Sequence, residues 1–122
     1  MLRLSLALII VMFISSAALA DWELYRRDRS ITASVDILSF APFHGQPSVW
    51  VRWHYDTPQN GVGGVKLRFT ANCLDHRLYE IAEYPYDTKG NFLPPQKRYG
   101  SPKEYPVTPD SLTEATYNLL CH

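Results

Sequence analysis

Two stretches that alternate strictly between core-forming and more polar residues constrain the fold more than any other feature. In Ser48–Tyr55, valine, tryptophan and tyrosine occupy the odd positions, while Trp50, Arg52 and His54 occupy even ones. In Val65–Cys73 the odd positions are apolar or cysteine, and the even positions are lysine, arginine, threonine and asparagine. Successive side chains of a strand point to opposite faces, so each stretch predicts a β-strand with one buried face.

Weaker patterns predict the remaining strands. They cover 21–27, 31–40, 77–84 and, as a short last strand, 104–108. A break is expected at Pro42–Pro47, and 57–64 is read as a turn region because it is rich in Pro, Asn and Gly. One long bent strand over Val65–Tyr84 is an alternative to two strands joined at a turn around Asp75 and His76. Prolines are concentrated between Pro85 and Pro109, which predicts loop or edge strand there.

The C-terminal segment has the periodicity of a helix. Leucine or alanine recurs at positions 112, 115, 119 and 120, which share one helical face. Ser111 and Glu114 form an S-x-x-E capping box at its start. The predicted fold class is therefore α+β, an antiparallel sheet of five or six strands with one C-terminal helix packed on it.

The first twenty residues have the composition of a secretory signal peptide. Arg3 is their one charged residue, an apolar run follows, and Ala18-Leu19-Ala20 supplies the small residues of a cleavage site. We expect cleavage between Ala20 and Asp21, which leaves one domain over 21–122. An uncleaved anchor is the alternative, although the run is at the short limit for a spanning helix. After cleavage we expect no stable membrane insertion, and a location in the periplasm, in the medium or at the cell surface.

Cys73 and Cys121 are the two cysteines of the chain. An even number of cysteines in an exported protein predicts a disulfide. Closure of so long a loop contributes about 4 kcal/mol in the chain-entropy view. The bond would connect the end of the helix to the strand that ends in Cys73, and two free buried thiols are the alternative.

Composition excludes several function classes. Lys and Arg together number 12, as do Asp and Glu, so the formal charge is zero. Such a balance argues against a nucleic-acid or membrane binder. An apolar content of 46% with 20% charged residues is typical of neither a disordered chain nor a membrane bundle.

The histidines suggest no catalytic or metal site. His44, His54, His76 and His122 lack the spacing of a metal-binding motif, so we expect no metal and no cofactor. The most specific enzymatic hypothesis joins His54, His76 and Arg52 as a small hydrolase, but nothing in their spacing brings them together. We therefore expect no catalytic residues and no enzymatic activity.

Binding is the better supported class of function, and two surfaces are candidates. The proline-rich stretch carries Lys97, Arg98, Tyr99 and Lys103, a local positive charge that could attract an acidic partner. A solvated connecting loop is the alternative reading. Trp50 and Arg52 share a strand face that would be exposed if the helix covers the other one, which suits a partner or a homodimer contact. Trp50 under a loop, or inside a closed barrel, is the alternative.

The chain resembles the surface-adhesin protein E family. The features that match are Val49-Trp50-Val51, the strand ending in Cys73 with Arg77-Leu78-Tyr79 after it, and Pro109-Asp110-Ser111-Leu112 through Cys121. It departs from the family at Asp110, where Gly is usual, and at Tyr105, where Trp is common. The resemblance implies an exported domain of this fold. It also suggests adhesion, although the lipidated cysteine of anchored relatives is missing near Ala20.

Together these observations predict an exported bacterial, non-enzymatic, adhesin-like protein. Its partner is expected to be a host matrix protein or a bacterial envelope protein, and not a nucleic acid. A periplasmic structural or envelope-stress module is the alternative, ahead of a small hydrolase.

Overall fold

The computed structural model describes residues 19–94 and 97–122, with the backbone alone at 97–99. The predicted signal peptide therefore lies outside the described residues, apart from its last two positions. Asp21 is already held by the fold. Its backbone N–H donates to Asp36 Oδ1 (3.1 Å), and its carbonyl accepts from the Ile37 N–H (2.9 Å).

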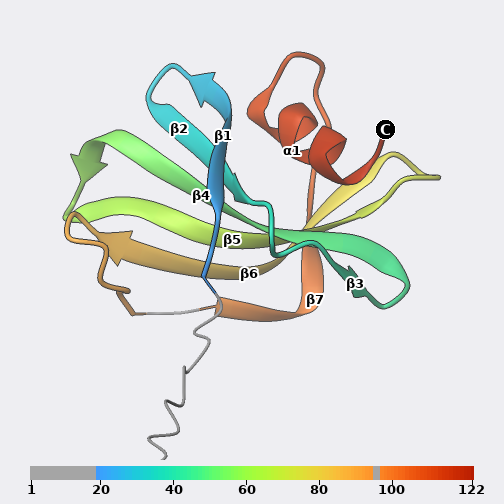
Figure 1. Cartoon of the computed structure of the whole chain (residues 1–122), viewed down its shortest axis with the longest axis horizontal. Helices are drawn as coiled ribbons and strands as arrows, with labels where there is room; N and C mark the ends of the chain where they lie inside the picture. Colours follow the sequence, from blue (N-terminus) through green and yellow to red (C-terminus); the bar gives the residue numbers. More distant parts are fainter. Residues whose placement is uncertain (1–18, 95–96) are drawn as a thin grey trace, which may run out of the picture.

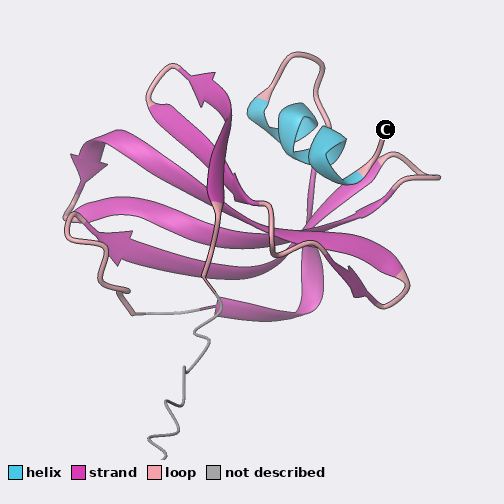
Figure 2. Cartoon of the chain, viewed as in Figure 1, coloured by secondary structure: helices cyan, strands magenta, loops and turns pink. Residues whose placement is uncertain are grey.

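Seven antiparallel strands form one sheet, and a single described helix lies on one side of it (Figures 1 and 2). The elements are β1 (Trp22–Asp28), β2 (Ile31–Asp36), β3 (Ala41–Phe43), β4 (Gln46–Gln59), β5 (Val62–Asn72), β6 (Arg77–Asp87), β7 (Lys97–Tyr105) and α1 (Leu112–Leu120). The strand order is β1-β2-β4-β5-β6-β7, and β3 also pairs with β4. This confirms the antiparallel sheet with a C-terminal helix.

The expected count of five or six strands is wrong, because the chain break predicted at Pro42–Pro47 contains the extra strand β3. Pro42 lies opposite Pro47 in a short pairing at the side of β4, where a missing N–H is tolerated. His44 and Gly45 turn the chain with φ of 48° and 78°. Positive φ at both central residues is the geometry of a two-residue hairpin.

The turn region expected over 57–64 shrinks to Asn60 and Gly61, with φ of 50° and 78°. Strands β4 and β5 continue on both sides of it because this tight turn matches the twist of the strands. Further along, β5 and β6 are separate strands joined by a turn at 73–76, so the alternative of one bent strand is wrong.

About half of the proline-rich stretch is strand, and its main strand lies at the sheet edge, in agreement with the expected loop or edge strand. Strand β6 continues to Asp87, and β7 forms the edge of the sheet from Lys97 to Tyr105. The boundaries 104–108 expected for the last strand are therefore wrong, since an edge position accommodates proline. Pro102 falls in the stretch where the β6–β7 register shifts.

The face of the sheet under α1 is the hydrophobic core, and we call it the covered face. Its buried members are Ala33, Val35, Val49, Val51, Val65, Leu67, Phe69, Ala71 and Leu78. Figure 1 shows α1 above this face, beside β1 and the β5–β6 hairpin. Alternation in β4 and β5 predicted its central residues correctly.

The predicted helical face is only partly correct. Leu112 and Leu120 are buried as expected, but Thr116 and Tyr117 are buried in place of Ala115 and Leu119. A chain of hydrogen bonds makes the burial of the threonine hydroxyl possible. Its Oγ donates to the Leu112 carbonyl (2.8 Å) and shares a hydrogen bond with the Tyr25 hydroxyl (2.9 Å).

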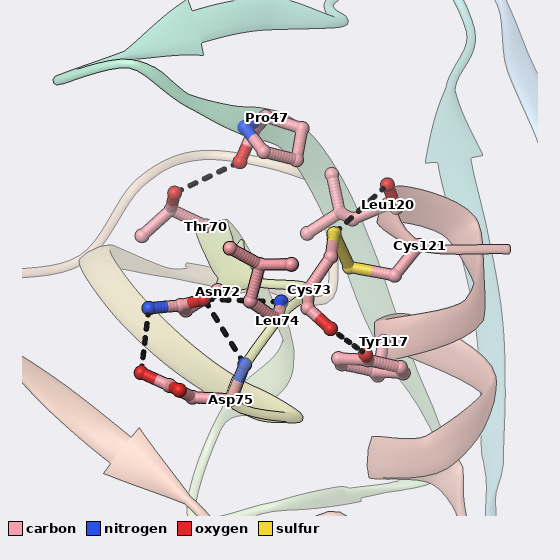
Figure 3. The surroundings of a disulfide bond; sticks show 9 residues. All are labelled: Pro47, Thr70, Asn72, Cys73, Leu74, Asp75, Tyr117, Leu120 and Cys121. Atoms are coloured by element: carbon pink, nitrogen blue, oxygen red, sulfur yellow. Dashed lines mark hydrogen bonds between the residues drawn. A yellow bond between two sulfur atoms is a disulfide. The ribbon is translucent and has the colours of Figure 1, made fainter.

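The end of α1 is attached to the sheet by the predicted disulfide, Cys73–Cys121, whose Cα atoms are 5.5 Å apart (Figure 3). Beside it the Tyr117 hydroxyl donates to the Cys73 carbonyl (3.3 Å). At the other end Ser111 Oγ accepts from the Glu114 N–H (3.2 Å), which confirms the N-cap.

Candidate binding surface

The opposite side of the sheet has no helix over it in the described part of the chain, and we call it the open face. The side chains that point to it are Trp22, Thr32, Ser34, Trp50, Arg52, His54, Lys66, Arg68, Tyr84 and Tyr86. Strand register places Arg52 directly opposite Lys66, and Trp50 directly opposite Arg68. Aromatic and basic residues from β1, β4, β5 and β6 are thereby collected on one surface.

The cations of the open face lie against aromatic rings. The Arg52 guanidinium is 4.6 Å from the Trp22 ring centroid. Lys66 Nζ lies between two indoles, 4.7 Å from Trp50 and 5.9 Å from Trp22. Each such contact contributes about 0.5–1 kcal/mol at an exposed site. The rings therefore fix the cations in place without neutralising them.

Among the side chains that the structure describes, no carboxylate forms an ion pair with these cations. The ion pairs found there are Arg26–Asp110 and Arg77–Glu104, and neither includes a cation of the open face. Carboxylates near this face accept local hydrogen bonds: Asp36 accepts two backbone N–H groups, Asp56 accepts from Thr32, and Asp87 accepts two backbone N–H groups. Arg52, Lys66 and Arg68 thus have no described carboxylate within ion-pair distance, although these three aspartates keep their negative charge nearby.

Stacked rings complete the surface. Trp50 stacks on Tyr84 with centroids 5.5 Å apart. Tyr86 stacks near His54, and its hydroxyl lies 3.3 Å from His54 Nδ1. The Tyr86 ring covers Gly64, where a Cβ would overlap it, so β5 requires glycine there. Burial is the main cause that raises the pKa of Tyr86, and nearby Arg52 opposes it.

The loop after β6 forms one rim of the open face. Asp87 Oδ1 accepts the N–H groups of Lys89 and Asn91, both at 2.9 Å, and these contacts lower the pKa of Asp87, with that of Asn91 the largest cause. The Leu93 N–H donates to the Pro85 carbonyl (2.8 Å). Phe92, half exposed, lies between these anchors and contacts Tyr84 at 6.0 Å. The rim is therefore a hydrogen-bonded loop whose aromatic residue, Phe92, pairs with Tyr86 in a short β-bridge.

Three hollows lie along the open face. Their volumes are about 220, 390 and 400 Å³. The first lies between Trp22, Lys66 and Phe92, and shares Arg52 and Tyr86 with the second. The third lies beyond the Trp50–Tyr84 stack and includes Arg68, which is 5.1 Å from the ring of Phe43. Each hollow has a basic side chain in its wall, although the second also includes Asp87, and the first includes Ala20, which the expected cleavage removes.

The predicted binding residues lie in different parts of the fold. Trp50 and Arg52 are half-buried members of the open face, and the described strand order is open between β1 and β7, so Trp50 is not inside a closed barrel. The side chains of Lys97, Arg98 and Tyr99 lie outside the described residues, and binding by that segment stays a prediction. Lys103 is exposed on β7, where its Nζ lies 5.2 Å from the Tyr105 ring.

Sequence reasoning missed Trp22, Lys66, Tyr84 and Phe92 as members of a site. A signal for Lys66 was present, because the polar positions of Val65–Cys73 carry the same kind of basic residue as those of Ser48–Tyr55. Trp22 could not be found in this way. Its contact with Arg52 depends on the pairing of β1 with β2 and of β2 with β4.

The histidines of the hydrolase hypothesis are not brought together. His54 pairs with Gly64 near the start of β5, while His76 follows the other end of β5 and packs on Tyr117 at 4.5 Å. Gly64 and Asn72 are eight positions apart along β5, which separates these ends by about 26 Å. In the described ranges no group of three or more His, Cys, Asp or Glu side chains could hold a metal ion.

Comparisons with known proteins give no identification: no family model, no curated protein and no solved structure matches the chain. Membership of the surface-adhesin protein E family therefore stays a prediction. Among the described residues, no helix has the length and apolar character needed to cross a membrane.

Proposed function

We propose that this is an exported bacterial binding protein without enzymatic activity, which contacts a protein partner through its open face. The observation that carries the proposal is the cluster of Trp22, Arg52, Lys66 and Trp50, in which two indoles hold two cations that form no ion pair with a described carboxylate. The partner is a host matrix protein or an envelope protein, in line with the resemblance to adhesins.

The composition of the open face supports binding to a protein. Tryptophan, tyrosine and arginine are enriched at protein interfaces, and they dominate the residues whose truncation weakens binding most. A sheet presents such side chains at fixed positions, so little conformational entropy is lost on association. The half-buried Trp50 and the half-exposed Phe92 offer apolar contact on either side of the cations.

Export is supported by the disulfide and by the backbone hydrogen bonds that hold Asp21 in the domain. Disulfides persist in oxidising compartments and are rare in the cytosol. The backbone of Asp21 bonds to Asp36 and Ile37, so cleavage after Ala20 would leave these contacts in the mature domain. Intact mass spectrometry of the exported protein should find Asp21 as its first residue. A mature chain that starts inside β1 would contradict this assignment.

A binding panel tests the proposal. Oxidised protein over 21–122 is immobilised and presented with purified extracellular-matrix and envelope proteins. Trp22→Ala should weaken the binding of a true partner by about 10-fold or more, because truncation of central interface aromatics has effects of this size. Leu74→Ala is the matched control, since Leu74 is 98% exposed at the β5–β6 hairpin, away from the open face. Equal losses in both variants, with folding intact, would contradict the proposal.

A further inference from the structure

We infer that the partner segment on the open face is an extended acidic peptide, whose alternate carboxylates contact Arg52, Lys66 and Arg68. The inference rests on the proposed function and adds the chemistry of the partner to it. Four features of the surface carry it: a repulsive pair of cations, the way aromatic rings hold them, the spacing of the cations, and the modest total charge of the chain.

The repulsive pair is Arg52 and Lys66, which the register places directly opposite each other on β4 and β5. Like charges at such positions destabilise a sheet. The Trp22 and Trp50 rings offset part of this cost, but no described carboxylate lies within ion-pair distance of either cation. A local rule broken without full compensation inside the fold points to a functional site. The compensation missing here is negative charge, which a ligand would bring.

The aromatic rings leave the cations able to bind negative charge from a ligand. A guanidinium that stacks on an aromatic ring keeps its N–H groups, which lie in its own plane, free for a carboxylate. Arg52 stacks on Trp22 in this way and forms part of two hollows. Arg68 donates one hydrogen bond to Ser48 Oγ (3.2 Å) and retains other donors. Both arginines are therefore fixed in place and able to pair with carboxylates.

The spacing suits an extended chain. Lys66 and Arg68 are two residues apart on β5, so their Cα atoms are about 6.6–7 Å apart. An extended peptide places alternate side chains at the same interval. Acidic residues at alternate positions could therefore follow β5, with Trp50 and Tyr84 beside them on the open face, while the residues between them point away from the sheet. Arg52, opposite Lys66, widens the positive site at one end.

The low total charge favours a peptide over a polymeric anion. Nucleic acids and anionic membranes are bound by extended positive fields, and log affinity for nucleic acid follows the number of phosphates neutralised. This chain is neutral overall, and its described open face contains three clustered cations among several rings. Such a surface combines a few charge contacts with apolar contact area, as a peptide requires.

The probe is a synthetic peptide with glutamate at alternate positions, and its control replaces every glutamate with glutamine. Binding is measured by calorimetry with the oxidised protein over 21–122. The double variant R52Q/K66Q should raise the Kd of the acidic peptide by about 10-fold or more, because two charge-assisted contacts are lost. The matched double variant R29Q/R77Q removes the same charge from positions outside the open face, and should change the Kd by less than about twofold.

The salt dependence of peptide binding is a second test of the inference. The affinity of the wild-type protein should fall between about 0.1 and 1 M salt, as the Debye length falls from about 10 to about 3 Å. Equal binding of the glutamate and glutamine peptides would overturn the inference, as would unchanged binding by R52Q/K66Q. Tighter binding of a sulfated polysaccharide or of phosphatidylglycerol vesicles, also lost in R52Q/K66Q, would overturn the assignment to a peptide.

Failure of this inference is distinguishable from failure of the proposed function. If a protein from the panel needs Trp22 but binds R52Q/K66Q as it binds wild type, the open face is a binding surface whose partner is not acidic. If every panel protein binds Trp22→Ala normally while binding of the acidic peptide still requires Arg52 and Lys66, the inference about an acidic peptide is supported. The proposed contact of a protein partner with Trp22 is then contradicted.

Discussion

The two faces of the sheet are built from the same strands and differ in almost every other respect. On the covered face, Val49, Val51 and Phe69 are fully buried, and the disulfide attaches the end of α1 to the sheet on this side. On the open face, the neighbouring positions of the same strands carry Trp50 and Arg68, half-buried and in contact with further rings. The covered face is a mainly apolar core that also buries the Glu80 carboxylate, which accepts from the Tyr105 hydroxyl (3.1 Å), while the open face carries opposed cations and partly exposed rings.

The difference indicates where selection for function acts on this chain. The covered face buries apolar side chains, and its buried hydroxyl and indole groups have hydrogen-bond partners, as a stable core requires. The open face tolerates two opposed cations and partly exposed aromatic area, features that a face selected for stability alone would not need. We therefore treat the covered face as the determinant of the fold and the open face as the determinant of binding.

The largest effect is expected from truncation of the covered face. Phe69 is fully buried and lies 5.5 Å from the Trp53 ring and 5.7 Å from the Tyr105 ring. Phe69→Ala should reduce the free energy of unfolding by about 4 kcal/mol, the usual cost of such a cavity. Trp50→Ala should cost less than half as much. Urea unfolding measures both, and equal losses would show that Trp50 is part of the core.

The disulfide should have the next largest effect. Cys73 and Cys121 are 48 residues apart, and the double variant C73S/C121S should lose up to about 4 kcal/mol because the unfolded chain gains freedom. Binding through the open face should survive at temperatures where the variant is folded, since the bond lies on the other side of the sheet. A folded variant that loses peptide binding would show that the two faces are not independent.

Alkaline pH should destabilise the covered face. Burial raises the pKa of Tyr25 from 10 to about 12 in the folded state, against the opposing hydrogen bonds with Thr116 and Trp53. Its neutral form is therefore favoured by folding. The corresponding stability is complete below pH 10 and is lost as the pH rises towards about 12, by about 2 kcal/mol. Unfolding free energies measured across this range test it, and Tyr25→Phe should show a smaller decline.

The smallest effect on stability is expected on the open face. Lys66→Gln removes one of two opposed cations but also its contacts with the Trp50 and Trp22 rings, so the two effects oppose each other and the free energy of unfolding should change by less than about 1 kcal/mol at low salt. The part due to repulsion should vanish at high salt, where it is screened. Urea unfolding at two salt concentrations measures it. A loss of more than about 1 kcal/mol would mean that Lys66 holds the fold together through its contacts with Trp22 and Trp50.

The same contrast explains what the sequence could predict. Alternation along β4 and β5 reveals which side chains are buried, because it is a local pattern, and Val51 and Phe69 were found from it. Strand β3 depends on positive φ at His44, a residue type that is not a strong turn signal. The length of β4 depends on the turn at Asn60-Gly61, and Asn-Gly is a strong hairpin signal that was missed because 57–64 was interpreted as a whole turn region. The contact of Trp22 with Arg52 joins residues 30 positions apart, and only the pairing of the sheet brings them together.

The central claim is that the open face binds and the covered face does not, and the indole N–H groups of the chain's three tryptophans report on both faces at once. Trp22 and Trp50 are on the open face, while Trp53 on the covered face donates to the Tyr25 hydroxyl (2.8 Å). When the alternating glutamate peptide is added, we expect the nitrogen-15 spectrum to show shifted indole signals for Trp22 and Trp50 and an unchanged signal for Trp53. Binding that shifts the Trp53 signal, or that leaves those of Trp22 and Trp50 in place, would contradict it.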